Sequence, residues 1–388
     1  MSHSLKVPFL DLALQYHSIQ EELETATLRT LRSGRYIMGD EVVEFERGFA
    51  EYTGSRYAVG VASGTDAIHL SLRALGIGPG HDVLTVANVS APTVCAILAT
   101  GARPVLIDID PRTFNMDPNR LADYLNKSRE RNPVKAIVPV HLYGRPADMK
   151  SIMEIANKFD IKVVEDASQS HGATIGDAMA GTIGEIGCFS LYPTKNLGAC
   201  GDAGVIVTNH ELMAEKLQML RNYGEKSRYE NSLVGFNSRL DEIQASLLSV
   251  KLKHLNRWTE RRRQIAFKYN QSFGKPGINT PGDSLENLAG HVYHLYVIQV
   301  ANRDQFRSEL MRLGVGTAVH YPKPIHHQFA FHAVCVTDGT LEVTEQACRN
   351  VVSLPLYPEM SDEAVEMVCN SISHLVRSGR CTLQNMVS

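Results

Sequence analysis

The chain has 388 residues and a formal net charge of −3; 44% of its residues are hydrophobic and 21% are charged. These values are typical of a globular protein with two or more domains and predict no general attraction to nucleic acid. No apolar run reaches the roughly 18 residues of a membrane-spanning helix, and residues 1–9 contain no apolar signal core. The seven cysteines are scattered without a Cys-x-x-Cys pair, which favours reduced thiols and a cytoplasmic location over disulfides or a zinc site.

The first half of the chain predicts an α/β fold. Apolar residues with a 3.6-residue period indicate helices at residues 12–33 and 41–53. Short apolar runs that predict strands then follow at residues 57–61, 82–86, 104–107, 135–140, 161–165, 187–191 and 204–208. Helices are predicted between them at residues 65–75, 92–100, 118–128 and 147–159. This alternation predicts a mainly parallel mixed sheet with helices on both faces and ligands at the carboxyl ends of its strands.

The second half of the chain has a different pattern. A long helical stretch runs from Arg239 to about Phe273. Beyond it the expected elements are strands at 291–300 and 315–320, and helices at 303–313, 340–350 and 361–377. We therefore expect a large domain at residues 1–250 and a smaller α+β domain at residues 251–388.

Two charged residues are placed just past the ends of predicted strands. Lys195 follows a strand and the turn formed by Tyr192 and Pro193, and Asp166 ends a run of valines. Taken singly, Lys195 could be a solvated surface lysine and Asp166 an ordinary cap or loop residue. Together they are the two protein groups that pyridoxal 5′-phosphate (PLP) needs: a lysine for a Schiff base and a carboxylate for the pyridinium nitrogen.

A third candidate group is the segment Ser63-Gly64-Thr65, which follows the first strand and opens a helix. Free backbone N–H groups and the helix dipole make such a start suitable for a phosphate, although an ordinary N-cap has the same pattern. Beside Asp166 and Lys195 it becomes a candidate phosphate site. Gln169 could reach a ring hydroxyl, and the role of His171 stays open between structural and catalytic.

Histidines on a proline-broken loop raise the question of a metal. His326 and His327 lie close to His320 and His332 in the sequence, but no cysteine or carboxylate stands at ligand spacing. We therefore expect no metal site, and a rim of the substrate cleft is the preferred interpretation of this loop.

Several motifs, in order and at similar spacing, resemble the DegT/DnrJ/EryC1/StrS family of PLP-dependent sugar aminotransferases. The main motifs are residues 63–67, 166–172 and 190–198, and further similar segments are residues 7–12, 36–39, 76–80, 141–144, 235–239 and 320–322. The resemblance covers nearly the whole chain. It implies the aspartate aminotransferase-like fold, which is PLP fold type I, with a large domain and a smaller C-terminal domain.

The resemblance also implies a PLP site made of seven residues, namely Gly64, Thr65, Asp166, Gln169, Ser190, Lys195 and Asn237. Lys195 would form the Schiff base and Asp166 would pair with the pyridine nitrogen, both as catalytic residues. Gln169 would lie near the ring hydroxyl, while Gly64, Thr65 and Ser190 would hold the phosphate. Asn237 would reach the phosphate in the neighbouring subunit, which implies a homodimer with shared active sites.

One position departs from the family pattern. Ser90 falls where the family usually places an aromatic residue over the cofactor ring. A serine side chain cannot stack on that ring, so no stacking residue is assigned.

The resemblance implies transfer of an amino group from L-glutamate to a nucleotide-linked keto-sugar. Residues 7–12, 141–149 and 237–241 are similar to members that aminate the 3-keto position of nucleotide-linked 6-deoxyhexoses, which favours a dTDP-3-keto-6-deoxyhexose. A 4-keto nucleotide sugar and a keto-cyclitol remain open as acceptors. A dehydratase of the same fold is disfavoured because such relatives replace the lysine, and a regulatory or scaffold protein that binds PLP is favoured only by Ser90.

Overall fold

The computed structural model describes residues 5–127, 132–273 and 290–378. Within these residues one eight-stranded sheet has the order β1-β9-β8-β5-β4-β2-β3-β13. Its strands are β1 (Tyr57–Val61), β2 (Asp82–Val86), β3 (Arg103–Ile107), β4 (Val134–Ile137), β5 (Lys162–Asp166), β8 (Ile186–Ser190), β9 (Gly204–Thr208) and β13 (Val336–Thr337). In this described sheet β9 pairs antiparallel with β1 and β8, and all other pairs are parallel, so the predicted mainly parallel mixed sheet is confirmed.

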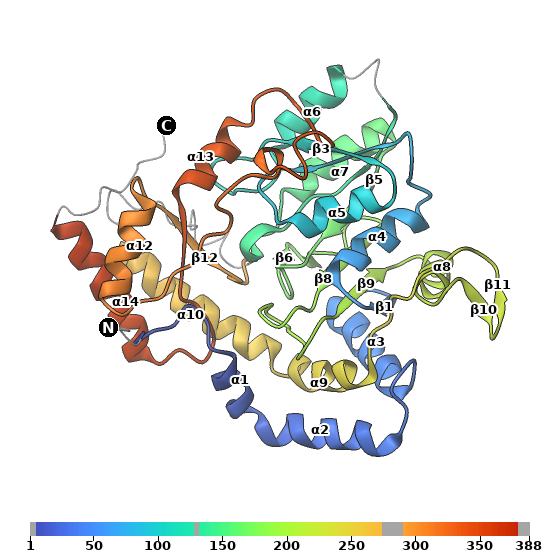
Figure 1. Ribbon diagram of the computed structural model, residues 1–388, viewed down its shortest axis with the longest axis horizontal. Helices are drawn as coiled ribbons and strands as arrows, with labels where there is room; N and C mark the ends of the chain where they lie inside the picture. The colour runs from blue at the N-terminus through green and yellow to red at the C-terminus, as the bar shows by residue number, and fades with distance from the viewer. Residues whose placement is uncertain (1–4, 128–131, 274–289, 379–388) are drawn as a thin grey trace.

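Helices cover both faces of this sheet (Figure 1). They are α3 (Asp40–Thr53), α4 (Gly64–Ala74), α5 (Ala91–Ala99), α6 (Pro118–Lys127), α7 (Met149–Phe159), α8 (Glu211–Arg221) and α9 (Glu242–Leu252). Successive side chains of a strand point to opposite faces. Val164 of β5 accordingly packs in a cluster with residues of α4 and α8, while its neighbour Val163 packs in a cluster with residues of α6 and α7.

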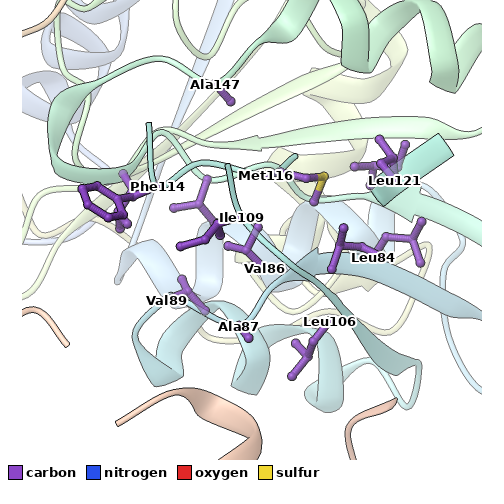
Figure 2. Packing of buried hydrophobic residues seen from close by; sticks show 14 of the residues in the cluster. Leu84, Val86, Ala87, Val89, Leu106, Ile109, Phe114, Met116, Leu121 and Ala147 are labelled. Carbon is purple, nitrogen blue, oxygen red and sulfur yellow. The ribbon is translucent and has the colours of Figure 1, made fainter. Parts of the chain in front are cut away.

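The cluster that contains Val163 extends to the end of β2, where the chain leaves the sheet. Figure 2 shows part of it, with Leu84 and Val86 of β2 and Leu121 of α6. Val89 belongs to the same buried group and directly precedes Ser90. The segment between β2 and α5 is therefore held by close-packed core residues rather than by surface contacts.

The C-terminal part has a hydrophobic cluster of its own. The elements that contribute to it are α10 (Leu255–Phe273), β12 (Tyr296–Gln299), α12 (Arg303–Arg312), β14 (Val351–Leu354) and α14 (Asp362–Arg377), with β12 and β14 paired antiparallel. The remaining helix, α13 (Glu342–Asn350), packs through Ala347 in the cluster that contains Val163. Several contacts cross the predicted boundary at residue 250, and two of them join backbone segments. Val7 is buried in this C-terminal cluster and bridges Val315, and β13 joins the edge of the large sheet beside β3. The boundary itself stays a prediction.

Smaller elements complete the described fold. They are α1 (Leu12–Ser18), α2 (Gln20–Ser33), the hairpin of β10 (Glu225–Ser227) and β11 (Glu230–Asn231), the hairpin of β6 (Thr174–Ile175) and β7 (Ala178–Met179), and the 3₁₀ turns η1 (Leu142–Gly144) and η2 (Ile325–His327). Figure 1 shows α1 and α2 near α9, and the hairpin of β10 and β11 beside α8. No helix in the described ranges is both long and apolar enough to cross a membrane.

The strand predicted at residues 291–300 is limited to β12, and three further predicted elements differ from the structure. The helix predicted at residues 12–33 is two helices, because Ile19 leaves helical geometry (φ −139°) and is buried in a cluster with Leu23 and Trp258. The long stretch that ends at Phe273 is likewise divided into α9 and α10. The strand predicted at residues 315–320 makes only isolated bridges, through Val315 and Ala318. Periodicity alone did not predict α8, β13 or β14.

Candidate active site

A hollow of about 340 Å³ lies at the carboxyl ends of β5 and β8. Six of the seven residues predicted for the site line it, namely Gly64, Thr65, Asp166, Gln169, Ser190 and Lys195. Ser90 also lines the hollow, so the position that lacks an aromatic residue does face the site. A wider hollow of about 660 Å³ lies along α10, but it contains none of these residues. The volume near Lys195 is within the roughly 300–1,000 Å³ usual for small-molecule sites.

Lys195 is carried by a tightly folded loop after β8. Its backbone N–H donates to the carbonyl of Tyr192 at 2.9 Å, so the chain turns sharply at this point. Gly198 allows the close return, because a Cβ there would lie 2.3 Å from the carbonyl oxygen of Pro193. The buried Lys251 then donates from Nζ to the carbonyl of Gly198 at 2.7 Å. These contacts fix the backbone from which Lys195 projects into the hollow.

The surroundings of Lys195 favour its uncharged amine. Burial among protein atoms lowers the pKa of Lys195 to about 8, and the nearby Asp166 carboxylate opposes that shift. Burial, followed by the charge of Lys195, also lowers the pKa of His171 to about 3 and that of His320 to about 4. Both imidazoles are therefore neutral at physiological pH, so neither adds a positive charge beside Lys195.

Asp166 is held by contacts from three segments. Its backbone N–H donates to the carbonyl oxygen of Pro139 at 2.9 Å, and its own carbonyl oxygen accepts from the backbone N–H of His141 at 3.0 Å. Its carboxylate accepts from the backbone N–H of Ser168 at Oδ1 (3.1 Å) and from the hydroxyl of Thr93 at Oδ2 (2.7 Å). Sequence reasoning missed Thr93, since the contact joins residues 73 positions apart and leaves no local pattern.

A buried acid–histidine pair lies directly behind Asp166. Glu165 accepts from His141 Nε2 at 2.9 Å and from the backbone N–H groups of Gly181, Ile183 and Gly184 at 2.6–2.8 Å. His141 Nδ1 accepts from Ala147 N–H, so its proton must be on Nε2. Burial raises the pKa of Glu165, but the His141 and backbone hydrogen bonds outweigh it and leave that pKa lowered. The pair fixes the end of β5.

Gln169 is oriented at both ends of its amide. Oε1 accepts from the backbone N–H of Tyr143 at 2.7 Å, and Nε2 donates to the hydroxyl of Tyr321 at 3.0 Å. Tyr321 belongs to the motif at residues 320–322, so a C-terminal segment closes against the large sheet at this point. Its contact with Gln169 was not predicted. The role of Gln169 toward a ring hydroxyl stays a prediction.

The phosphate site predicted at the start of α4 has the expected local geometry. Ser63 is the N-cap, and its hydroxyl accepts from Asp66 N–H at 3.1 Å, a cap of the kind that stabilises a helix by about 1 kcal/mol. The first backbone bond of this helix start runs from Ala67 N–H to Ser63, so the N–H groups of Gly64 and Thr65 precede it. A Cβ on Gly64 would lie 2.5 Å from Ser190 Cβ, which shows how closely β8 approaches the helix start.

Asn237 lies apart from the other six residues. It is exposed, bridges Asn222 and does not line the hollow of this subunit. Its neighbour Ser238 is buried and donates to Asp66 of α4 at 2.8 Å, which ties this segment to the predicted phosphate site. The position is compatible with the predicted role in a neighbouring subunit, and that role stays a prediction.

In the structure a carboxylate from a distant helix lies beside the histidine loop at residues 320–332, a contact that the sequence spacing did not predict. Glu345 of α13 lies 3.2 Å from His326 Nε2 and 3.3 Å from His327 Nε2. His332 instead contacts the carbonyl of Phe329. The distances to Glu345 are those of ordinary ion pairs or hydrogen bonds, and the expectation of no metal stays a prediction.

His171 is fully buried against the Phe189 ring, with centroids 5.4 Å apart, and does not line the hollow.

Comparison with known proteins decides the family. The model of the DegT/DnrJ/EryC1/StrS aminotransferase family matches residues 17–373. The chain belongs to this family. The predicted sugar aminotransferase class, PLP fold type and cofactor are thereby confirmed.

Individual members of the DegT/DnrJ/EryC1/StrS family match over almost their full length. The dTDP-3-amino-3,6-dideoxy-alpha-D-galactopyranose transaminase of Aneurinibacillus thermoaerophilus is 43% identical over 367 residues, which cover 95% of this chain and 99% of the relative. A pleiotropic regulatory protein of Geobacillus stearothermophilus is 39% identical over 375 residues, covering 96% and 99%. The crystal structure of S. venezuelae DesV in complex with a ketimine intermediate has a TM-score of 0.90 at 38% identity, covering 96% of this chain and 98% of that chain.

The hollow of this DegT/DnrJ/EryC1/StrS aminotransferase fits PLP by its donor set. It combines a lysine amine of lowered pKa, a fixed carboxylate and a glycine at a helix start that leaves no room for a Cβ. When bound, PLP supplies an electron sink for the carbon that gains or loses nitrogen. Lys195, Asp166 and the start of α4 are the groups of this chain that would hold it.

Proposed function

We propose that this aminotransferase transfers the amino group of L-glutamate to the 3-keto carbon of a dTDP-linked 6-deoxyhexose. The observation that carries the proposal is 43% identity, over 95% of the chain, to a relative whose name gives a dTDP-linked 3-amino-3,6-dideoxy sugar. The similar segments at residues 7–12, 141–149 and 237–241 support the same position on the sugar. A 4-keto nucleotide sugar and a keto-cyclitol are the alternative acceptors.

Lys195 is the proposed nucleophile and proton carrier. An amine with a pKa of about 8 is partly uncharged near neutral pH, so it can attack a carbonyl carbon. Once released, the same amine can take a proton from the carbon that bears the transferred nitrogen and return it on the other side of the reaction. Since glutamate and sugar react in turn at one hollow, we expect ping-pong kinetics.

Asp166 and the start of α4 are proposed to orient the cofactor. A carboxylate against the ring nitrogen keeps that nitrogen protonated, and the N–H groups of Gly64 and Thr65, with the Ser190 hydroxyl, suit a phosphate. Asn237 is proposed to complete the phosphate site of a second subunit in a homodimer. The six free cysteines among the described residues are compatible with the cytoplasmic location that we propose.

A regulatory role is the second candidate, because one similar relative is named a pleiotropic regulatory protein. A protein that acts only as a regulator does not need a lysine, a carboxylate and a phosphate site at one hollow. Those groups support catalysis in this chain.

The acceptor is best tested in the reverse direction, where the substrate is a stable amino sugar. Purified protein loaded with PLP would be given 2-oxoglutarate and a dTDP-3-amino-3,6-dideoxyhexose, and glutamate formation would be measured. The dTDP-4-amino-4,6-dideoxyhexose is the matched control for position, and Lys195→Ala is the control for catalysis by the protein. We expect glutamate from the 3-amino sugar only, and roughly 10²-fold or greater loss in Lys195→Ala.

Equal or faster reaction of the 4-amino sugar would contradict the proposed position on the ring. No glutamate from either sugar, in a protein that carries PLP, would contradict the nucleotide-sugar proposal and leave the cyclitol and regulatory alternatives.

A further inference from the structure

The Asp166 carboxylate accepts a hydrogen bond from Thr93, a contact that its proposed pairing with the ring nitrogen does not itself require. Thr93, at the third position of α5, is only 2% exposed and its Oγ1 lies 2.7 Å from Asp166 Oδ2. An ionised carboxylate can only accept hydrogen bonds, so the hydroxyl must donate. Both Thr93 and Asp166 line the hollow that also contains Lys195.

The contact restricts the direction in which Asp166 can act. Ser168 N–H fixes Oδ1 and Thr93 fixes Oδ2, so the plane of the carboxylate is set from two different segments. Hydrogen bonds to the charged form of a carboxyl favour that form, and short bonds to an ionised acceptor are stronger than neutral ones. The β-branched Thr93 side chain has few accessible rotamers and therefore holds its hydroxyl in place.

We propose that Thr93 is a positioning residue, which keeps the Asp166 carboxylate aimed at the ring nitrogen of the cofactor. The proposal rests on the cofactor role proposed for Asp166, but not on the identity of the sugar. Loss of the hydroxyl would weaken the hold of Asp166 on the protonated ring nitrogen. A protonated ring nitrogen repels the positive charge on the lysine–cofactor linkage. If the ring nitrogen loses its proton, this repulsion is removed, and the linkage would keep its own proton to a higher pH.

Other ionisable groups face Asp166 as well. Lys195 lies in the loop after β8, Cys188 is on β8, and Tyr321 comes from the C-terminal part, while Glu165 of β5 points to the opposite face of the sheet. None of these is on α5, so replacing Thr93 removes one donor and leaves the other charged or ionisable neighbours unchanged. An altered titration in a Thr93 variant can therefore be traced to the missing hydroxyl.

The test compares Thr93→Val, which keeps the shape and removes the hydroxyl, with Thr93→Ser, which keeps the hydroxyl. Each protein would be loaded with PLP, and the visible absorption band of the lysine-linked cofactor would be titrated with pH. We expect the midpoint of Thr93→Val to rise by about 0.5–1 pH unit, since one hydrogen bond to a charged group is lost. Thr93→Ser should keep the wild-type midpoint, and Thr93→Val should bind PLP roughly threefold to tenfold more weakly.

The double variant separates this inference from the role of Asp166 itself. Asp166→Asn should shift the midpoint on its own, and adding Thr93→Val should then cause no further shift, because both act through one carboxylate. If Asp166→Asn leaves the midpoint unchanged, the cofactor role of Asp166 fails. If Asp166→Asn shifts the midpoint but Thr93→Val does not, the role of Thr93 is overturned. If Thr93→Val folds poorly, the same titrations would be made with Thr93→Ala, which also lacks the hydroxyl donor.

Discussion

At the scale of single residues, the chemistry of the site depends on how each charged group is held. Lys195 stands on a loop fixed by Lys251 and by the close approach of Gly198 to Pro193. Asp166 is fixed through both carboxylate oxygens. The two groups therefore line the same hollow in fixed positions, and the lowered pKa of Lys195 makes its amine reactive.

The lowered pKa of Lys195 gives a prediction for the pH dependence of cofactor capture. Only the neutral amine reacts with an aldehyde, and its fraction rises with pH through the pKa. The rate at which the apoprotein captures PLP should therefore rise through about pH 8 and then level off. The measurement is stopped-flow absorbance across pH, with N-acetyl-lysine amide as the reference for the titration of PLP itself. A rate that still climbs near pH 10, where an ordinary lysine titrates, would contradict the assigned environment.

At the scale of elements, the sequence was most informative where strands are buried on both faces. The strands predicted at residues 57–61, 82–86 and 204–208 have the predicted bounds, because continuous apolar runs between turn residues carry a strong local signal. The same alternation of strands and helices predicted the edge of the sheet at which Asp166 and Lys195 meet.

The parts that were not predictable depend on contacts between distant residues. The break at Ile19 reflects burial against Trp258 of α10, and β13 is a strand of two residues that exists through pairing with β3. Thr93 meets Asp166, and Glu345 meets His326, with no shared periodicity along the chain. Six of the seven predicted site residues do come together, since they follow neighbouring strands or open the adjacent helix.

The contact between α4 and β8 gives a prediction at the same scale. In Gly64→Ala the new Cβ would meet Ser190 Cβ at 2.5 Å, so the helix start must move away from the strand. We expect a loss of about 1–3 kcal/mol in unfolding free energy, measured by urea denaturation, together with weaker PLP binding.

Gly48→Ala is the matched control for this substitution. Gly48 lies inside α3, and a Cβ there would find its nearest neighbour, Leu252 Cδ2, at an ordinary 3.7 Å. This change should stabilise the protein by about 0.5–1 kcal/mol and leave PLP binding unchanged. Equal stability and PLP affinity in the two variants would show that the helix start does not depend on its approach to β8.

At the scale of the whole molecule, the hollow is lined by residues between Ser63 and Ala203, and the C-terminal part supports it through Gln169. Tyr321 of the C-terminal part binds Gln169, and the buried Arg262 of α10 donates to the carbonyls of Tyr293 and Leu356. Asn237, in contrast, is exposed and lies outside this hollow. We therefore propose that Asn237, a predicted site residue, contributes to the site of a second subunit.

Mixed dimers test that proposal directly. In a dimer of one Lys195→Ala subunit and one Asn237→Ala subunit, a shared arrangement leaves one site with both residues. That site should bind PLP as tightly as wild type, measured from the visible band of the lysine-linked cofactor in differently tagged, co-purified dimers. The Asn237→Ala homodimer should bind more weakly, and Asn119→Ala, an exposed residue of α6, should be unchanged. A mixed dimer no better than the Asn237→Ala homodimer would contradict shared sites.

We propose that this chain uses PLP on Lys195 to accept an amino group from L-glutamate. An absorption spectrum of the purified protein before and after glutamate is added would test this proposal. We expect a visible band from the lysine-linked cofactor that fades with glutamate and is missing from the Lys195→Ala protein. A protein that shows no such band after incubation with PLP, or a band that glutamate leaves unchanged, would contradict it.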